Sequence, residues 1–253
     1  MQPIPQMLIV LCPLVLLAGF VDSIAGGGGL ISLPAYYLVG LPPALAAGTN
    51  KLTAAMGTAL AAYNYGRSGK VHKRIGLIGG GGAFACSALG VLLMKQLPDH
   101  LIRWLVMGCI LVAAFFTLWG HRDTDSRRAW SMRQTAALSL AVGCATGFYD
   151  GLIGPGTGTF LILLLARIFG LEAVLASGTA KIVNLASNLA ALISLLITGD
   201  VLIIVGLPAG ACAMLGAYLG SRLTIRKGSR FVRFIMLAVL GLLLAKLCVD
   251  MLG

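Results

Sequence analysis

The stretch GFYDGLIGPGTGTF (Gly147–Phe160) lies inside a long apolar run and interrupts it. It contains one acid, Asp150, which is followed by four glycines around Pro155. A carboxylate and a series of helix-breaking residues are both costly inside a lipid bilayer, the environment that the surrounding apolar run predicts. The stretch therefore predicts a helix that breaks open part-way across a membrane, where it faces protein or a wet cavity.

The composition of the whole chain also indicates a membrane protein. Of the 253 residues, 58% are hydrophobic and only 11% are charged, against about 25% charged residues in soluble domains. The net charge of +11 comes mainly from Lys and Arg in short loops with few aromatic neighbours, a pattern that sets membrane topology and does not indicate nucleic-acid binding. The six cysteines form neither a CxxC motif nor a Cys–His cluster, so we expect no metal and no cofactor.

The interrupted stretch occurs twice in the chain. DSIAGGGGLI (Asp22–Ile31) resembles DGLIGPGTGT (Asp150–Thr159). GLPPALAAGTNKL (Gly40–Leu52) resembles GLEAVLASGTAKI (Gly170–Ile182) at nearly the same offset along the chain. These matches predict a tandem duplication within one membrane domain, with an N-terminal repeat at 1–120, a polar linker at 121–134 and a C-terminal repeat at 135–253.

Each repeat contains the same four apolar blocks, at 7–41, 44–66, 75–94 and 101–119 and at 136–171, 173–198, 201–221 and 231–249. The last three blocks of each repeat have about 19 to 26 residues, enough to cross a core of ~30 Å at 1.5 Å per residue. The first block is longer, and its glycines divide it into arms of about 14 residues, for example 136–149 and 158–171, each too short to cross alone.

The basic loops change places between the repeats. Loop 67–74 is basic while its counterpart holds only Asp200, and loop 222–233 is more basic than its counterpart 95–103. The positive-inside rule then predicts that loops 67–74, 121–133 and 222–233 are cytoplasmic and that both termini lie outside. Inverted repeats need an odd number of crossings each. We therefore predict an all-α integral membrane protein with two inverted repeats, each with one re-entrant helical hairpin and three transmembrane helices.

Each broken segment exposes the N-terminus of a half-helix, where free N–H groups and a partial positive charge favour anions. Paired broken elements in inverted repeats indicate the substrate site of a transporter. We therefore expect substrate to bind at Gly27, Gly28, Gly29, Gly156, Thr157 and Gly158. In the alternative interpretation, these glycines only allow helices to pack closely.

Two lysines, in AGTNK (Ala47–Lys51) and SGTAK (Ser177–Lys181), lie well inside apolar blocks and should face a partner or a wet cavity. With nearby hydroxyl and amide groups they predict an oxyanion site. The expected substrate-binding residues are Thr49, Asn50, Lys51, Thr179, Lys181, Asn184 and Asn188. Alternatively, Lys51 pairs with Asp22 and Lys181 with Asp150 as structural clasps. The two interpretations can coexist, and either aspartate could carry a coupling proton.

DSIAGGGGLISLP with GLPPALAAGTNKL, and GFYDGLIGPGTG with ASGTAKIVNLASN, resemble the TauE/SafE sulfite exporter family, also called TSUP, over nearly the whole chain. The resemblance implies proton-coupled export of a small sulfur-containing anion, such as sulfite, a sulfonate or a related oxyanion, across the bacterial inner membrane. The partners expected from it are this anion, the lipid bilayer and protons.

Three other functions share some of these sequence features. A passive anion channel has the same features as a carrier and remains an alternative. An intramembrane aspartyl-type protease is less well supported, because FVDS at Asp22 is not a GxGD setting and the two aspartates fall in opposite-facing hairpins. A membrane scaffold lacks a long loop to bind a partner. The stretch GGGGAF (79–84) lacks the Lys-Ser/Thr of a phosphate-binding loop. We therefore expect a transporter driven by an ion gradient and no enzyme.

Overall fold

The computed structural model describes residues 3–98, 101, 130–232 and 234–238, and every statement about structure below refers to them. The predicted spans 101–119 and 231–249 and the linker 121–134 fall wholly or largely outside this part of the chain. The described elements are the helices α1 Ile4–Ala25, α2 Gly29–Leu38, α3 Pro43–Arg67, α4 Lys73–Met94, α6 Met132–Leu152, α7 Thr157–Phe169, α8 Ala173–Ile197 and α9 Ile203–Lys227.

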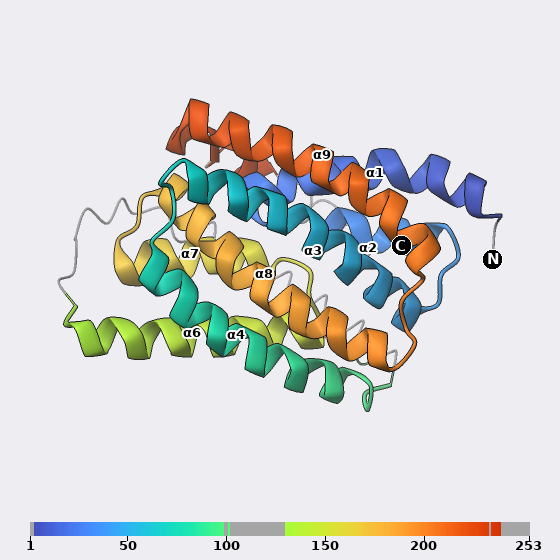
Figure 1. Ribbon diagram of the computed structural model, residues 1–253, viewed down its shortest axis with the longest axis horizontal. Helices are drawn as coiled ribbons and strands as arrows, with labels where there is room; N and C mark the ends of the chain where they lie inside the picture. Colours follow the sequence, from blue (N-terminus) through green and yellow to red (C-terminus); the bar gives the residue numbers. More distant parts are fainter. Residues whose placement is uncertain (1–2, 99–100, 102–129, 233, 239–253) are drawn as a thin grey trace, which may run out of the picture.

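The helices form two packed groups that lie side by side (Figure 1). In the first group, α1 packs along α9, and α3 packs against α9 and α2. In the second group, α6 packs along α4, and α8 packs against α4 and α7. The two groups meet mainly along α3 and α8. Each group thus combines helices from before and after the linker, so neither half of the sequence folds into a separate unit.

Within each group, the same contact between a helix and the start of its neighbour is made at equivalent positions of the duplicated sequence. Thr49 Oγ1 accepts a hydrogen bond from the backbone N–H of Leu202 at 3.0 Å. Thr179 Oγ1 accepts one from the backbone N–H of His72 at 2.9 Å. The offset that aligns Gly40–Leu52 with Gly170–Ile182 also aligns Thr49 with Thr179, and His72 with Leu202. In both places a threonine of one half of the chain supports the residue that precedes a long helix of the other half.

The pairs α1–α2 and α6–α7 are helical hairpins. Trp130 Nε1, just before α6, donates a hydrogen bond to the carbonyl of Ile168 near the end of α7 at 2.8 Å. Met7, near the start of α1, belongs to one buried apolar cluster with Val39 and Leu41, which follow α2. Each hairpin therefore begins and ends at the same end of the bundle.

The prediction of two short arms of similar length, such as 136–149 and 158–171, is wrong, because each hairpin has one long and one short arm. Helix α1 has 22 residues and α2 has 10, and α6 has 21 residues while α7 has 13. The long arms start before the apolar blocks do. A capping box formed by Ser131 and Gln134 starts α6 at Met132, and a proline in the first turn helps to start α1.

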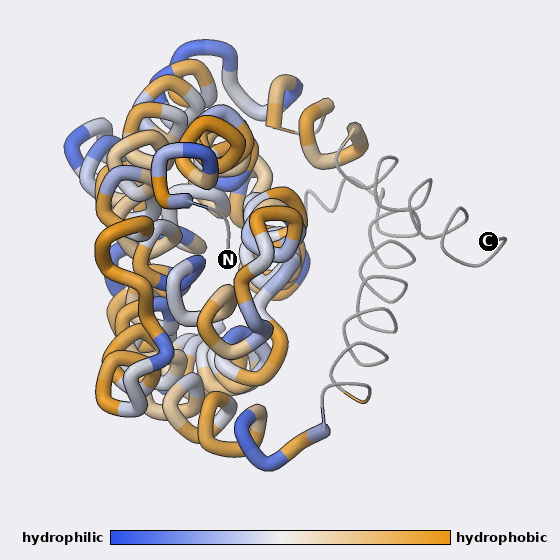
Figure 2. Tube along the Cα trace, turned by 90° about the vertical axis from the view of Figure 1, so that its right-hand side faces the viewer, coloured by the Kyte–Doolittle hydropathy of each residue, from blue (hydrophilic) through white to orange (hydrophobic). Residues whose placement is uncertain are grey.

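Four described helices, α1, α4, α8 and α9, are long and apolar enough to cross a membrane. Helix α3 has 25 residues but carries Asn50 and Lys51 in its apolar run. Ile9, Leu77 and Ile197 are each at least 70% exposed, as expected for side chains that face lipid. Figure 2 shows hydrophobic residues along the helices and hydrophilic ones at several of the turns. The chain is an integral membrane protein.

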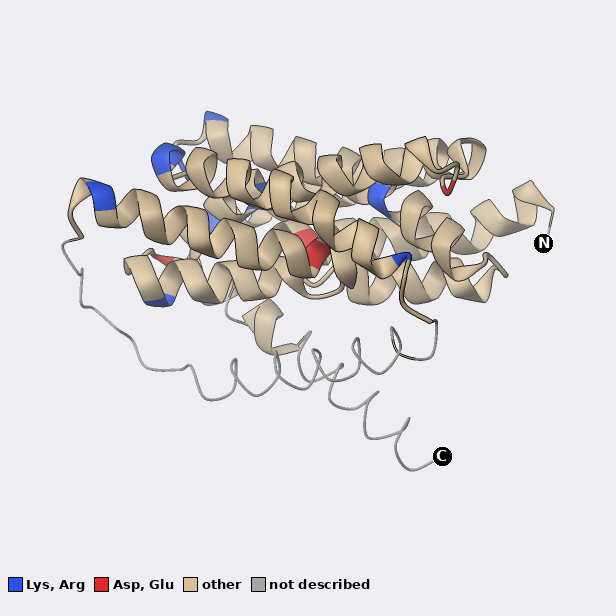
Figure 3. Ribbon diagram, turned by 90° about the horizontal axis from the view of Figure 1, so that it is seen from below, with Lys and Arg blue, Asp and Glu red and all other residues tan. Residues whose placement is uncertain are grey.

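The two ends of the bundle differ in charge (Figure 3). Hydrogen bonds from Arg74 to the Met132 carbonyl and from Ser229 to Glu172 bring the loops of one end together. The basic residues in or near the loops of this end are Arg67, Lys70, Lys73, Arg74, Arg133, Arg167, Arg222, Arg226, Lys227 and Arg230. At the opposite end, Lys95 forms an ion pair with Asp200 at 2.7 Å. Most of the basic charge therefore lies at the end away from the start of α1.

A substitution of Gly26 tests the contact between the two hairpins. Gly26 has a φ of +80°, and a Cβ atom there would overlap the backbone of Gly158 in the other hairpin. Gly40 has a similar φ of +84° but open space around it. We expect Gly40→Ala to cost about 1 kcal/mol of backbone strain, and Gly26→Ala to cost roughly 3 kcal/mol or more, because backbone atoms must also separate. Thermal unfolding in detergent measures both. Equal losses would contradict the contact between the hairpins.

Candidate functional site

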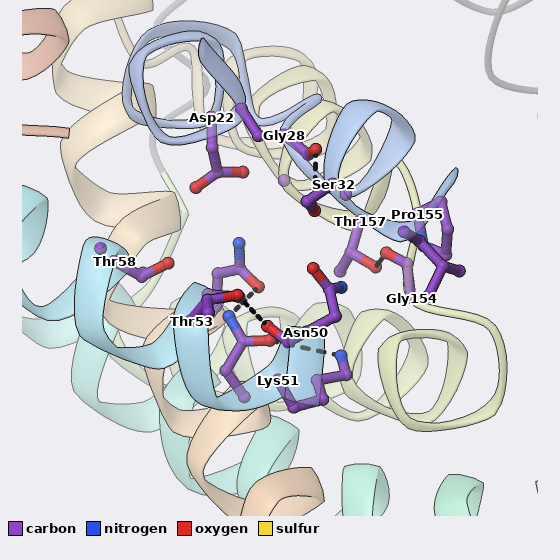
Figure 4. A pocket seen from close by; sticks show the side chains of 18 of the residues that line it. Asp22, Gly28, Ser32, Asn50, Lys51, Thr53, Thr58, Gly154, Pro155 and Thr157 are labelled. Atoms are coloured by element: carbon purple, nitrogen blue, oxygen red, sulfur yellow. Dashed lines mark hydrogen bonds between the residues drawn. The ribbon is translucent and has the colours of Figure 1, made fainter. Parts of the chain in front are cut away.

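A cavity lies at the junction of the two hairpin breaks, between the two helix groups (Figure 4). It holds about 720 Å³ of atom-free space, including its open mouth. The lining comes from all the described helices except α4, and from the breaks between α1 and α2 and between α6 and α7. The predicted site residues that line it are Asp22, Gly28, Gly29, Asn50, Lys51, Asp150, Gly156, Thr157, Gly158, Asn184 and Asn188.

The short arms of both hairpins begin at this cavity. Helix α2 begins at Gly29 after Gly28, and α7 begins at Thr157 after Gly156, which has a φ of +88° that favours glycine. The first N–H groups of a helix have no acceptor within the helix, and they carry its partial positive charge. Two helix N-termini, one from each half of the chain, therefore reach one cavity.

The negative ends of the long arms are capped by protein groups. The hydroxyls of Tyr65, Ser177 and Thr159 donate hydrogen bonds of 2.8 to 3.1 Å to the carbonyls of Ser23, Ile24 and Ala25 at the end of α1. At the end of α6, Lys51 Nζ donates to the backbone carbonyl of Asp150 at 2.9 Å. These bonds satisfy carbonyl groups that would otherwise be unpaired inside a membrane.

Two ion pairs join the helix groups. Each lysine pairs with the aspartate of the other half of the chain, and not with the aspartate of its own half as the sequence alternative had it. Lys51 Nζ lies 2.8 Å from Asp150 Oδ2, and Lys181 Nζ lies 2.7 Å from Asp22 Oδ2. The pairing of Lys51 with Asp22 and of Lys181 with Asp150 is therefore wrong. The hairpin breaks lie against each other at the centre, so each aspartate faces the long helix of the other half of the chain.

The two ion pairs have different surroundings. Lys51 has three acceptors, because Asn188 Oδ1 at 3.3 Å joins the carboxylate and the carbonyl of Asp150. Asp150 also accepts a hydrogen bond from Ser187 Oγ at 2.7 Å. In the other pair Lys181 is fully buried, whereas the Asp22 side chain is 20% exposed and lines the cavity. Asp22 is therefore the more open of the two carboxylates.

Four predicted site residues do not line the cavity, namely Gly27, Thr49, Thr179 and Lys181. The two threonines bind backbone amides at the starts of α9 and α4, as described above. Asn184 and Asn188 do line it, and Asn188 Nδ2 donates to Asn184 Oδ1 at 3.3 Å. The predicted residues thus divide into a lining set and a supporting set.

The sequence interpretation missed Thr53 and Thr58, which line the cavity from α3. Thr58 is the counterpart of Asn188 at the same offset that aligns Thr49 with Thr179. Helical spacing from Asn50 also places Thr53 and Thr58 on one face. Both signals were present in the sequence. The polar face of α8 was followed as far as Asn188, and following the polar face of α3 over the same length would have included Thr53 and Thr58.

Comparison with known proteins identifies the family. The model of the family described as sulfite exporter TauE/SafE matches residues 11–247. The chain belongs to the TauE/SafE sulfite exporter family. The chain is 35% identical over 240 residues to a probable membrane transporter protein of Haemophilus influenzae, covering 92% of this chain and 91% of the relative. It is 34% identical over 247 residues to the probable membrane transporter protein YfcA of Escherichia coli K12, covering 97% and 91%.

A more distant relative is the probable membrane transporter protein YdhB of Bacillus subtilis, which is 28% identical over 224 residues, with 86% of this chain and 90% of the relative covered. No solved structure matches this TauE/SafE protein. The relatives point to a membrane transporter rather than an enzyme.

Double-mutant cycles test the exchanged ion pairs of this TauE/SafE transporter. We expect Asp22→Asn and Lys181→Met to couple by about 1 kcal/mol or more in unfolding free energy, and Asp150→Asn and Lys51→Met to do the same, because removing one partner leaves a buried charge unpaired. The cycles that combine Asp22 with Lys51, or Asp150 with Lys181, serve as controls and should give near-additive effects. Stronger coupling in the control cycles would contradict the observed pairing.

Proposed function

We propose that this TauE/SafE transporter is a secondary transporter that carries a small sulfur-containing anion, such as sulfite, a sulfonate or a similar oxyanion, through the cavity between the hairpins. The observation that supports it most is the meeting of two helix N-termini, of α2 and α7, at one cavity. Backbone N–H groups at such ends bind oxyanions. The substrate would contact Gly28, Gly29, Gly156, Thr157 and Gly158.

The charges around the cavity favour an anion of low charge. The two lysines and the two aspartates neutralise each other in ion pairs. The remaining field comes from the two helix N-termini, each equivalent to roughly half a positive charge. Together they would balance an anion of about one negative charge. In this proposal Lys51 and Lys181 act indirectly, because they neutralise the two aspartates and hold the hairpins in place.

The proposed architecture consists of two inverted repeats with re-entrant hairpins. The contacts repeated at equivalent positions of the two halves and the return of each hairpin to its starting end support it. The basic end of the bundle would be cytoplasmic, so α1–α2 would enter from outside and α6–α7 from the cytoplasm of a bacterial inner membrane. The N-terminus would then lie outside.

We further propose that Asp22 carries the coupling proton and that Asp150 has a structural role. Asp22 opens to the cavity, and the only hydrogen bond to its side chain among the described residues comes from Lys181. Asp150 is held by Lys51 and Ser187 and is nearly buried. An intramembrane acid that a proton can reach from a wet cavity is a common element of proton-coupled transport.

Anion counterflow in proteoliposomes tests this function. Vesicles would be loaded with sulfite, an alkylsulfonate or a carboxylate control, with and without a pH gradient. We expect saturable exchange of the sulfur-containing anions that responds to the gradient. Folded protein that moves none of these anions would refute the substrate class, and a flux that does not saturate would indicate a channel.

The variant Lys181→Met tests the role of the charges. It leaves the Asp22 carboxylate without its neutralising partner beside the cavity. We expect counterflow to fall about tenfold or more, because a like charge near the site repels the anion. The double variant Asp22→Asn/Lys181→Met restores neutrality and should recover exchange without its response to pH. A double variant as inactive as the single one would contradict this electrostatic role.

Cysteine labelling tests the orientation. In a cysteine-free background, Ser68→Cys lies in the basic loop after α3, and Gln96→Cys lies at the opposite end after α4. Both positions are exposed. A membrane-impermeant maleimide added to intact cells should label Gln96→Cys and not Ser68→Cys. The reverse pattern would invert the proposed topology.

A further inference from the structure

The cavity contains two buried polar side chains without a protein partner, both on α3. Asn50 is 8% exposed and Thr58 is 2% exposed, and both line the cavity. Asn50 Oδ1 and Thr58 Oγ1 are buried and form no hydrogen bond with any described residue. Figure 4 shows Asn50 extending from α3 into the cavity, with Asp22 and Ser32 across from it and Thr58 farther along the same helix. Buried polar groups are usually paired, so an unpaired group in a cavity points to a ligand.

The corresponding face of α8 has fewer polar groups that are free to hydrogen-bond a ligand. Asn188, the counterpart of Thr58, accepts a hydrogen bond from Lys51 and donates one to Asn184. Lys51 itself has three acceptors. Between Asn50 and Thr58, the residues Thr53, Ala54 and Gly57 also line the cavity. The two helices therefore differ, and α3 is the side on which a ligand can make new hydrogen bonds.

The cavity presents acceptors as well as donors. The N-termini of α2 and α7 offer N–H donors, which suit anionic oxygens. Asn50 Oδ1 and the partly exposed carboxylate of Asp22 are acceptors, and they need a hydrogen that a bare oxyanion does not have. Because the side chain of Asn50 has no partner at all among the described residues, its amide presents an acceptor in either orientation.

We propose that the substrate is a small anion that carries a hydroxyl group, as a hydrogen-bond donor, a short distance from its anionic group. The helix N-termini hold the anionic group, and Asn50 and Thr58 bind the donor end beside Asp22. This inference rests on the proposed function, because it specifies the anion that the same cavity transports. It makes Asn50 and Thr58 the residues that determine specificity.

Three sulfonates of the same length test the inference in counterflow. Ethanesulfonate has no donor, 2-hydroxyethanesulfonate has a hydroxyl, and 2-aminoethanesulfonate has an ammonium group, which makes it a zwitterion without net charge. We expect 2-hydroxyethanesulfonate to have a KM about tenfold or more below that of ethanesulfonate, because a site built to hydrogen-bond a group rejects the analogue that lacks it. The ratio of the two KM values is the readout, so differences in the amount of active protein cancel.

Asn50→Leu and Thr58→Val should each bring this ratio close to one. Thr146→Val is the matched control, because the Thr146 hydroxyl is buried and bonded to the Val142 carbonyl at 2.7 Å in α6, away from the cavity lining. It should keep the wild-type ratio. Thermal unfolding in detergent establishes whether each variant is folded. Thr58→Val keeps the shape of the side chain, so it still tests the inference if Asn50→Leu does not fold.

The outcomes separate the inference from the proposed function. Saturable transport of all three sulfonates with equal KM values would overturn the inference and leave the proposed function standing. A preference that persists in both variants would overturn the assignment to Asn50 and Thr58. Folded wild-type protein that transports neither sulfite nor any sulfonate would overturn the proposed function itself, and the inference with it.

Discussion

The structure depends on one constraint, namely that a helix broken inside a membrane must satisfy its freed backbone groups within the protein. The chain meets this constraint differently at the two kinds of helix end. The carbonyl ends of α1 and α6 are capped by hydroxyls and by the ammonium group of Lys51. The N–H ends of α2 and α7 open to the cavity. Because the carbonyl ends are capped and the N-termini of the short arms line the cavity, the breaks support the proposed anion site.

The exchanged ion pairs follow from placing the two breaks against each other. Lys51 and Asp150 lie on different helix groups, and so do Lys181 and Asp22. Each group contains helices from both halves of the chain. If one group moved against the other, the boundary of the movement would therefore lie between α3 and α8, and not at the linker. Such a movement would strain both ion pairs, and a buried charge that loses its partner costs about 3 to 5 kcal/mol. The pairs would therefore hold the groups in a limited number of relative positions.

Much of the site could be predicted from the sequence, because breaks and charges in apolar runs are costly and therefore conspicuous. The glycines after Asp22 and Asp150 and the lysines at 51 and 181 all fall at or beside the cavity. The partners of the lysines could not be predicted, because a duplicated sequence suggests contacts within each copy, whereas the exchange depends on three-dimensional packing. The start of α6 was predictable in principle, since Ser131 and Gln134 have the spacing of a capping box. Thr49 and Thr179 show the limit of the approach, because a buried hydroxyl can serve a backbone amide as well as a substrate.

The openness of Asp22 gives the proposed proton coupling a physical basis. An anion at the N-termini of α2 and α7 would place negative charge near Asp22, and this favours the uptake of a proton by its carboxylate. A proton on Asp22 would in turn leave the positive charge of Lys181 uncompensated, and this favours the anion. The two effects are equal in free energy, because linkage between two binding sites is reciprocal. Asp150 is less suited to this exchange, because Lys51 and Ser187 hold its carboxylate in a nearly buried network. Two aspartates in equivalent positions of the repeats therefore have different roles in this proposal, and the difference arises from their neighbours on α3 and α8.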